Sequence, residues 1–540
     1  MKASLRTAVI AALICIACSE KEDPSGNGPV VHFVGVGATS LVLPPWESVD
    51  IPFWVEDKDA PVGDVKLLLD GGKEPAEFFL KEITRGEVKG SYRAVIQDAG
   101  LDESYERNVH LAVVQRNPST GNEYYVQSSS IKVMSESDPA GTVKTGLPVV
   151  YVQTQGGKPV KSKTEFVTAE LRIRGVQGLP GLDPVGCQIR GRGNTTWEWP
   201  KKPYLIKLDE KRSIFGMPKH KRWVLLANFM DRTLMRNLVS MKVASMMSNL
   251  DWTPGCVPVE LVLNGKHQGS YLLIEQVRVD DDRVNITEMT PQDNTGNAVT
   301  GGYLLELDFH YDNEKQWKDP HGSNNQSGGG VPFGVKYPDP DELTSQQFSY
   351  IKQYVYDAAE ALYGDDFRSP AKGWRACLDE DSFIDYWLVF EVMGNHELGN
   401  PGSVFFHKDR GGKLVAGPCW DFDWGVLSYN TSPHARTGLV NGNAIWYGRL
   451  MKDPDFKARL KARFEEMRPR LETIPDYMDE CERLLTESAK LNFAMWNPAE
   501  DASMNGGRII NGDENMTFHE AVALLKKIYK ERLEVISRNL

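Results

Sequence analysis

The chain reads Trp-Asp-Phe-Asp-Trp-Gly at residues 420–425, so that the carboxylates of Asp421 and Asp423 lie one residue apart among three aromatic rings. Aromatic walls exclude water and strengthen any charge that they surround. On an extended segment the side chains at i and i+2 point to the same side, and one or two carboxylates hold Mg²⁺ in many proteins. The motif follows a strand–turn–strand pattern at 403–407 and 413–415. It indicates a divalent-cation site, although by itself it also fits an Asx turn at a strand end with the tryptophans in the core.

The composition is that of a soluble protein with more than one domain. A length of 540 residues is too great for one hydrophobic core, which predicts two or three domains. The hydrophobic content of 41% and the charged content of 25% are ordinary for a globular protein. The net charge of −12 argues against nucleic acid as a partner.

The cysteines predict neither a disulfide framework nor a zinc site. Five of the seven remain once Cys15 and Cys18 are assigned to the N-terminal segment, and they are scattered along the chain. There is no CxxC pair and no HExxH pattern. Cys419, beside the acidic motif, has no histidine placed in sequence to activate it, so we interpret it as a packed small hydrophobe.

Residues 1–18 are predicted to be a lipoprotein signal peptide. Lys2 and Arg6 form a basic region, residues 8–16 are apolar, and Cys18 follows in a sequence that resembles a bacterial lipobox, although Cys15 stands where leucine is usual. An ordinary secretory signal with a chance cysteine is the alternative. Residues 19–29 are expected to be a flexible tether, and its acidic start resembles the surface-export signals of Bacteroides-type lipoproteins. These features imply a protein of the bacterial cell envelope, lipid-anchored through Cys18 to the outer membrane, with surface exposure as one option because the membrane face is left open.

Residues 30–134 are predicted to form an immunoglobulin-like β-sandwich. Short alternating apolar runs recur between turn residues, as in a domain of about seven strands. The expected strands are 30–34, 49–55, 65–69, 92–96, 109–114, 124–126 and 130–133. No site chemistry is visible here, so we expect a spacer or an interaction module, followed by a linker at 135–146.

Residues 147–540 have an α+β pattern, with a strand-rich first part that resembles a kinase N-lobe and a helical C-terminal part. A helix is expected at 233–247 with Asp231 as its N-cap, and Asn264-Gly265 predicts a hairpin. Residues 312–332 are expected to be a mobile loop. The expected strands are 147–153, 167–174, 187–190, 204–208, 223–227, 257–263, 268–276 and 302–307, and the later helices are 343–362, 379–393, 444–452, 455–474, 477–492 and 518–539.

Two neighbouring segments carry residues suited to phosphate. Residues 190–197 form a glycine-interrupted turn after a strand, in which the backbone can approach a phosphate while Arg190 and Arg192 clamp it. The next strand has Lys202 at its start and Lys207 near its end, and a strand lysine that faces a nucleotide neutralises phosphate charge. Each segment alone also fits a structural turn or a solvated edge strand.

In their order along the chain, these segments resemble the CotH family, the spore-coat-type atypical protein kinases. The matching stretches are 190–197 with 201–208, 228–237, 259–276, 301–306 and 420–423. Five motifs in the family's order, within residues 147–540, are more specific than any one of them. The N-terminal sandwich and lipobox resemble the Bacteroidetes lipoprotein branch.

The resemblance implies a kinase that binds ATP with Mg²⁺ or Mn²⁺ in a cleft between two lobes and phosphorylates Ser or Thr of a partner protein. Asp421 matches the family's metal-binding aspartate, and Asp423 can share the ion. Lys202 or Lys207 matches the lysine that contacts phosphate. Glu275 lies where the chain would pass the adenine.

The catalytic loop departs from the family's pattern. The family has Asn-x-Asp with the aspartate as the base, whereas this chain has Asn395-His396-Glu397, so that Glu397 takes the place of the base. Glutamate is one methylene longer, and a misplacement of about 1 Å can cost about 10²-fold in rate, yet its carboxylate still accepts a proton. His396 is an alternative base, and Asn400 is an alternative metal ligand.

Two functions therefore remain open. The first is a membrane-anchored, extracytoplasmic kinase that transfers the γ-phosphate of ATP, and the presence of both Asp421 and Asp423 favours it. The second is a catalytically weak or inactive kinase-fold lipoprotein that binds a protein or a glycan. Glu397, the 13 tryptophans and the scarcity of ATP outside the cytoplasm favour the second.

Overall fold

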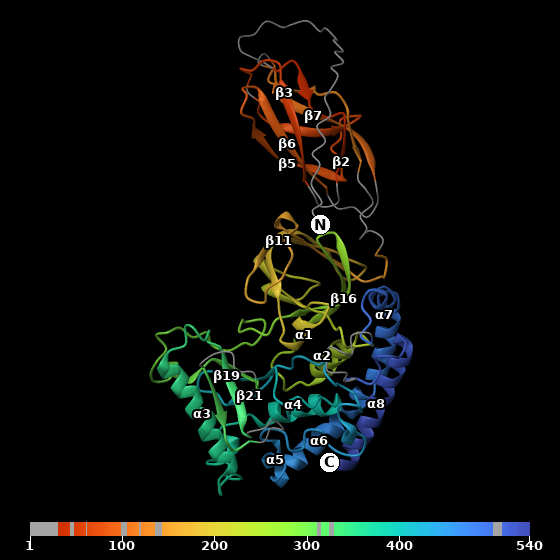
Figure 1. The fold of residues 1–540 in the computed structure, drawn as a ribbon. Coiled ribbons are helices and arrows are strands. Elements are labelled where there is room, and N and C mark those ends of the chain that lie inside the picture. The colour runs from red at the N-terminus through yellow and green to blue at the C-terminus, as the bar shows by residue number, and fades with distance from the viewer. Residues whose placement is uncertain are drawn as a thin grey trace. The chain divides into compact units, whose positions relative to one another are not determined.

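The computed structural model describes residues 31–43, 48–60, 62–98, 105–117, 120–134, 143–309, 315–322, 329–499 and 510–540 (Figure 1). The chain divides into two compact units, residues 1–144 with 265–267 and residues 145–264 with 268–540. Strands build the first unit, whereas strands and helices together build the second. The fold is therefore mixed α+β, as the sequence predicts.

Two β-sheets with a common core form the first unit. One has the strand order β1-β3-β6-β5, and the other has the order β2-β9-β7-β4 with β8 paired to β7. Alternate side chains of β3, those of Ile51, Phe53 and Val55, are buried because successive residues of a strand point to opposite faces. The strands are β1 (Val34–Val36), β2 (Ser40–Val42), β3 (Ser48–Val55), β4 (Val65–Leu69), β5 (Phe78–Arg85), β6 (Ser91–Asp98), β7 (Glu106–Arg116), β8 (Glu123–Gln127) and β9 (Ile131–Met134).

Two of these strands, β2 and β5, were not predicted. β2 has only three residues, which is too short for a periodic pattern. β5 exposes most of its side chains and carries Lys81, Glu82 and Arg85, so that its apolar residues do not alternate regularly. The other seven strands overlap the expected runs, although β1 does so only at Val34. Most of the predicted linker at 135–146 lies outside the described residues.

Seven strands at the start of the second unit close into a barrel in the order β10-β11-β12-β13-β14-β16-β15. Parallel pairing of β10 with β15 closes it. Ile189, Ile206 and Trp223 are among the fully buried side chains that fill the barrel. The strands are β10 (Val149–Thr154), β11 (Val167–Arg174), β12 (Leu182–Gly191), β13 (Tyr204–Arg212), β14 (His220–Leu226), β15 (Cys256–Leu263) and β16 (Lys266–Glu275).

The predicted hairpin between β15 and β16 is confirmed at its turn. Asn264 and Gly265 have φ angles of 52° and 70°, and a two-residue turn of type I′ requires positive φ at both positions.

Helix α2 (Arg236–Met246) is the helix expected at 233–247, but the prediction of Asp231 as its N-cap is wrong. Met235 occupies that position and makes no side-chain cap. The Asp231 carboxylate instead accepts hydrogen bonds from the backbone of Thr233 (2.9 Å) and Arg236 (2.8 Å), and it pairs with the Arg236 guanidinium. A buried ion pair therefore takes the carboxylate that the sequence assigns to the cap.

A five-stranded sheet with the order β18-β19-β17-β20-β21 follows the barrel. The expectation of a loop throughout 312–332 is wrong where it meets this sheet, because β18 forms within it and Trp317 packs on Phe333 with ring centres 5.5 Å apart. Residues 312–314 and 323–328 of that loop lie outside the described residues. The strands are β17 (Tyr303–Leu307), β18 (Gln316–Asp319), β19 (Val331–Tyr337), β20 (Val404–Lys408) and β21 (Leu414–Ala416).

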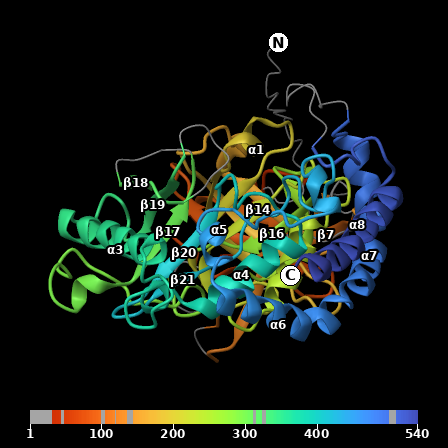
Figure 2. The same ribbon diagram turned by 90° about the horizontal axis from the view of Figure 1, so that it is seen from below.

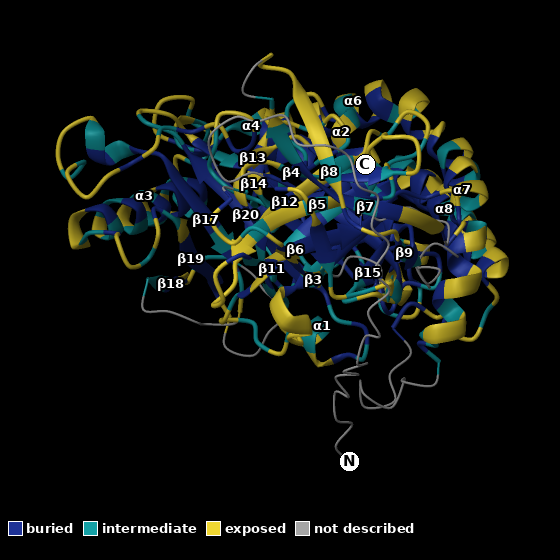
Figure 3. Ribbon diagram, turned by 90° about the horizontal axis from the view of Figure 1, so that it is seen from above, coloured by how far each residue is buried: buried dark blue, intermediate teal, exposed yellow. Residues whose placement is uncertain are grey.

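The C-terminal helices pack around α4, in which every side chain from Ser382 to Val392 is buried. Figure 2 shows α3 beside the five-stranded sheet and α7 with α8 on the opposite side of α4. The outer faces of α7 and α8 are exposed (Figure 3). No helix among the described residues is long and apolar enough to cross a membrane. The remaining helices are α1 (Thr195–Glu198), α3 (Ser345–Tyr363), α4 (Glu380–Val392), α5 (Tyr447–Leu450), α6 (Pro454–Leu471), α7 (Ile474–Met495) and α8 (Phe518–Asn539).

Candidate active site

The acidic motif lies in a loop after β21, and its backbone is not extended as the sequence suggests. Asp421 has a φ of 64°, which is the left-handed region that a side chain rarely adopts. Phe422 is fully buried and packs on Phe390 with ring centres 4.7 Å apart. Trp420 is also buried, whereas Trp424 is half-buried and stacks on Trp199. The core thus holds the aromatic residues, and the loop turns between them to present the carboxylates.

Three side chains hold the backbone of this loop. Asn237 accepts the Phe422 N–H at 2.7 Å, Asn511 accepts the Gly425 N–H at 3.1 Å, and Arg236 donates to the Val426 carbonyl at 2.9 Å. Arg236 is itself fixed between the carboxylates of Asp231 and Asp513, all three of them buried. Two consecutive residues of α2, Arg236 and Asn237, therefore contact the backbone of this loop within the motif and just after it.

The carboxylates at this loop disfavour one another's charge. Burial, and next the Asp421 carboxylate, raises the pKa of Asp423. Burial also raises the pKa of Asp421, while the Arg192 guanidinium and a hydrogen bond from Ser403 oppose that rise. Burial, followed by the charges of Asp421 and Asp423, raises the pKa of Glu397 well above its ordinary range. Three oxygen-bearing side chains thus lie close enough to repel, with Arg192 as the nearby cation.

These groups suit a hard divalent cation chemically. Oxygen is the donor that Mg²⁺ prefers, and a cation would offset the repulsion. Glu397 Oε2 is buried without a hydrogen-bond partner. Among the described residues, no group of three or more His, Cys, Asp or Glu side chains is arranged to hold a metal ion by itself. Asn400, the alternative ligand, is half-buried three residues after Glu397.

His396 is the other candidate base. Its Nδ1 is buried without a hydrogen-bond partner, and the ring lies against Gly425, where an added Cβ would meet Cε1 at 3.0 Å. Burial, and then His434, lowers the pKa of His396, so that the ring is neutral near pH 7 and can accept a proton.

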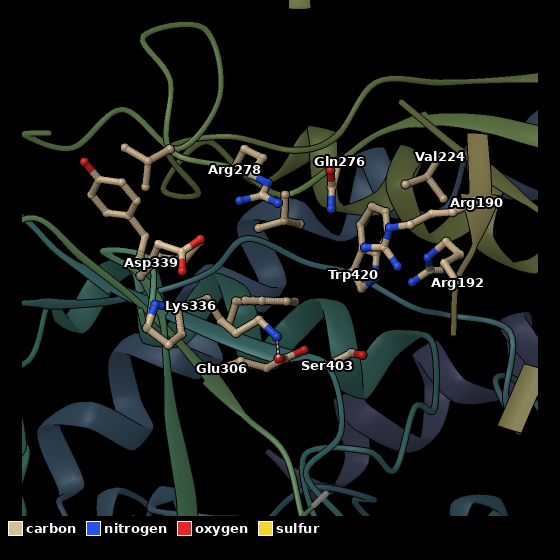
Figure 4. A pocket seen from close by; sticks show the side chains of 16 residues that line it. Arg190, Arg192, Val224, Gln276, Arg278, Glu306, Lys336, Asp339, Ser403 and Trp420 are labelled. Carbon is tan, nitrogen blue, oxygen red and sulfur yellow. Dashed lines mark ion pairs between the residues drawn. The ribbon is translucent and has the colours of Figure 1, made fainter. Parts of the chain in front are cut away.

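A cavity of about 450 Å³ opens beside this loop, between the barrel and the five-stranded sheet. Figure 4 shows Arg190 and Arg192 at one end of it and Lys336 with Asp339 at the other, with Trp420 and Gln276 between. The Arg192 guanidinium lies 5.6 Å from the ring centre of Trp420, the residue directly before Asp421. The lining side chains are those of Arg190, Arg192, Val224, Gln276, Val277, Arg278, Val279, Leu304, Glu306, Lys336, Tyr337, Asp339, Pro340, Ser403, Phe405 and Trp420.

The structure brings only some of the predicted residues to this cavity. Lys202 does not line it, and its amine donates to the Trp197 carbonyl at 2.6 Å. Lys207 lies on the outer face of the barrel, paired across the strands with Gln188 and Arg222. The Glu275 carboxylate points elsewhere, accepting the Gly255 N–H at 2.9 Å and pairing with Arg283.

Sequence reasoning missed Gln276, Arg278, Lys336 and Asp339. Gln276 directly follows Glu275, the last residue of β16, and lines the cavity in its place. The alternation of side chains along a strand is the sequence signal that distinguishes Gln276 from Glu275, because consecutive residues must point to opposite faces.

The remaining two residues with a predicted role are cysteines, Cys18 and Cys419. Cys18 lies outside the described residues. Cys419 is fully buried, and burial raises the pKa of its thiol well above the ordinary value, as for a packed hydrophobe.

A cationic cavity beside buried carboxylates is the chemistry of a site for a metal-bound polyanion. A family model described as CotH kinase protein matches residues 189–536, which include the cavity's Arg190 and the whole acidic loop. The chain belongs to the CotH kinase protein family, as its motifs indicate. No curated protein matches the chain.

Proposed function

We propose that this protein is an atypical protein kinase that transfers the γ-phosphate of ATP to Ser or Thr of a partner protein, with Mg²⁺ or Mn²⁺ as cofactor. The observation that carries the proposal is the cationic cavity, whose lining includes Trp420, the residue directly before Asp421. In this proposal the barrel with its adjoining helix α2 and the helical part are the two lobes of a kinase. The N-terminal unit is an immunoglobulin-like sandwich that serves as a spacer or an interaction module.

The roles of the side chains follow from their charges. Asp421 and Asp423 hold the cation, and the cation neutralises phosphate charge. Arg192, which lies over the Trp420 ring, contacts the donor's phosphates. Glu397 accepts the proton of the acceptor hydroxyl, and its ionised form is favoured once the charges of the two aspartates are offset.

A second function is favoured by one observation. Burial, and then the charges of Asp421 and Asp423, raises the pKa of Glu397 and so disfavours the ionised carboxylate that a base requires. This supports the alternative of a catalytically weak or inactive member that binds a protein or a glycan. Binding of the nucleotide with its metal is the property that separates the two functions.

The first test is the substitution Asp421→Asn, which keeps the shape of the side chain and removes its charge. We expect Mg²⁺-dependent ATP binding, measured by calorimetry, to fall below detection while the melting temperature stays near that of the wild type. Asp366→Asn, an exposed carboxylate on a surface turn, is the control and should bind normally. Wild-type protein without affinity for Mg²⁺-ATP at millimolar concentrations would leave the binding-module function standing.

We further propose that the protein is a lipoprotein of the Bacteroidetes branch, anchored to the outer membrane through Cys18. The sequence of the first residues supports this, because a short apolar run ends in a cysteine and a polar tether follows. In cells, Cys18→Ala should move the protein from the membrane fraction to the soluble fraction. Unchanged fractionation of this variant would contradict the lipid anchor.

A further inference from the structure

Three arginines gather on the outer face of the barrel beside the cavity. Arg190 on β12 and Arg222 on β14 place their guanidinium carbons 5.2 Å and 5.8 Å from the ring centre of Phe166. Arg278, just after β16, lines the cavity together with Arg190. Arg222 lies two residues before Val224, another lining residue, so both point to the same face of β14.

Within the described ranges, no carboxylate forms an ion pair with these three groups. In the described part of the chain, the Arg222 and Arg278 side chains donate no hydrogen bond to another residue and form no ion pair, while Arg190 donates only to the carbonyls of Lys163 and Gly191. Burial, and then the charges of Arg278 and Arg192, lowers the pKa of Arg190. Burial, and then the charges of Arg278 and Arg190, lowers the pKa of Arg222. Asp339 is the one carboxylate that opposes burial at Arg278.

The three arginines cannot relieve their mutual repulsion by deprotonation, because a guanidinium does not lose its proton in a protein. An anion that joins these clustered, half-buried guanidinium groups would therefore stabilise them. Among the described residues of the cavity, Glu306 is already paired with Lys336 at 2.7 Å, and Asp339 acts on Arg278 without forming an ion pair with it.

Arg222 and Arg278 are distinct from the arginine that lies beside the proposed metal-bound phosphates. Arg192 is the arginine that acts on the charges of Asp421 and Asp423. The Arg278 charge acts on both Arg190 and Arg222, and Arg190 also acts on Arg222.

We propose that Arg222 and Arg278, with Arg190, form an anion subsite for a phosphate group other than the metal-bound phosphates of the donor. The ligand is free phosphate or a phosphomonoester on the acceptor, and both present the same tetrahedral dianion to three planar donors. That the subsite is separate from the donor's phosphates rests on the proposed function. Binding of phosphate at the subsite does not itself require phosphate transfer.

The test uses the full chain and inorganic phosphate, titrated by calorimetry in EDTA at constant ionic strength with chloride as reference. We expect saturable binding that Arg222→Gln and Arg278→Gln each weaken by about ten- to a hundredfold, as for lost hydrogen bonds between charged groups. Lys221→Gln removes the same charge from the same strand outside the cluster, where the lysine contacts the Asp209 carbonyl, and should bind like the wild type. A parallel arm with a phosphoserine peptide distinguishes the sources, since tighter binding of the peptide assigns the subsite to an acceptor and tighter binding of phosphate assigns it to the free ion.

Thermal unfolding distinguishes a variant that has lost phosphate binding from one that is misfolded. Without ligand, Arg222→Gln should melt at the wild-type temperature or above it, because a repulsion is removed, but phosphate should no longer raise its melting temperature. Phosphate binding should also persist in Asp421→Asn and in the presence of saturating Mg²⁺-ATP. The proposal is overturned if the wild type binds no phosphate at tens of millimolar, or if Mg²⁺-ATP displaces the phosphate and Arg222→Gln leaves its affinity unchanged. Neither result depends on whether Asp421→Asn abolishes nucleotide binding.

Discussion

The position of the Glu397 side chain and its protonation both affect the proposed phosphate transfer. Within the described residues its Oε2 is buried without a hydrogen bond, and burial, followed by the charges of the aspartates beside it, raises its pKa. A buried oxygen without a hydrogen-bond partner costs stability, of the order of 1–3 kcal/mol for an unsatisfied polar group. Such a cost is common where a site is arranged for a reaction rather than for folding.

Glu397→Gln should separate binding from turnover. We expect the affinity for Mg²⁺-ATP to stay within a few-fold of the wild type and phosphate transfer to fall by about 10²- to 10⁴-fold, because a base acts in the transition state and not in ground-state affinity. The measurement is transfer of labelled phosphate to a Ser/Thr-containing acceptor beside calorimetry of the nucleotide. If transfer survives in Glu397→Gln and is lost in His396→Asn, the base is His396.

Among the larger elements, Lys201 joins the barrel to helix α7. Its amine is fully buried and donates to the Ala227 carbonyl and to Asn492 Oδ1, both at 2.8 Å, and to the Ser270 carbonyl. Burial lowers the pKa of Lys201 from 10.5 to about 7. The folded protein therefore binds this proton less tightly than the unfolded chain does, and the contribution of Lys201 to stability rises with pH between about 7 and 10.5.

Lys201→Met should lower stability and change its dependence on pH. At pH 7 we expect a loss of about 1–3 kcal/mol, the cost of buried acceptors left unpaired. The advantage of the wild type over the variant should grow from pH 7 to pH 9.5, measured as the midpoint of urea unfolding. Lys219→Met, at an exposed position, is the control. A difference between wild type and Lys201→Met that does not change with pH would contradict the role assigned to burial.

The periodicity of apolar residues along the sequence predicted most helices and strands of this fold. The features that it missed depend on contacts between residues far apart in the sequence. Alternation located β11 at its observed bounds, and the apolar stripe with its polar start located α8, because both signals are local. Closure of the barrel depends on β10 choosing β15, a distant partner that no periodicity specifies. The same holds at the site, where Asp421 was found by its neighbours in sequence, but its left-handed backbone is set by contacts with Asn237 and the core.

At the scale of the whole molecule, the chain should behave as two separable units. The predicted linker at 135–146 is rich in Ser, Asp, Pro and Gly and has few residues able to pack. Limited proteolysis should therefore cut there first and leave two resistant fragments that mass spectrometry can assign. One resistant fragment spanning both sides of the linker would contradict this boundary.

The closed barrel also limits how another protein can bind to it. An open sheet ends in a strand with unpaired N–H and C=O groups, and an extended peptide can be added there. In this barrel β10 pairs with both β11 and β15, so the strand that begins the second unit has no free edge. A partner of the barrel must therefore recognise side chains and loops, and sequence changes on that surface can alter the choice of partner without disturbing the backbone pairing beneath.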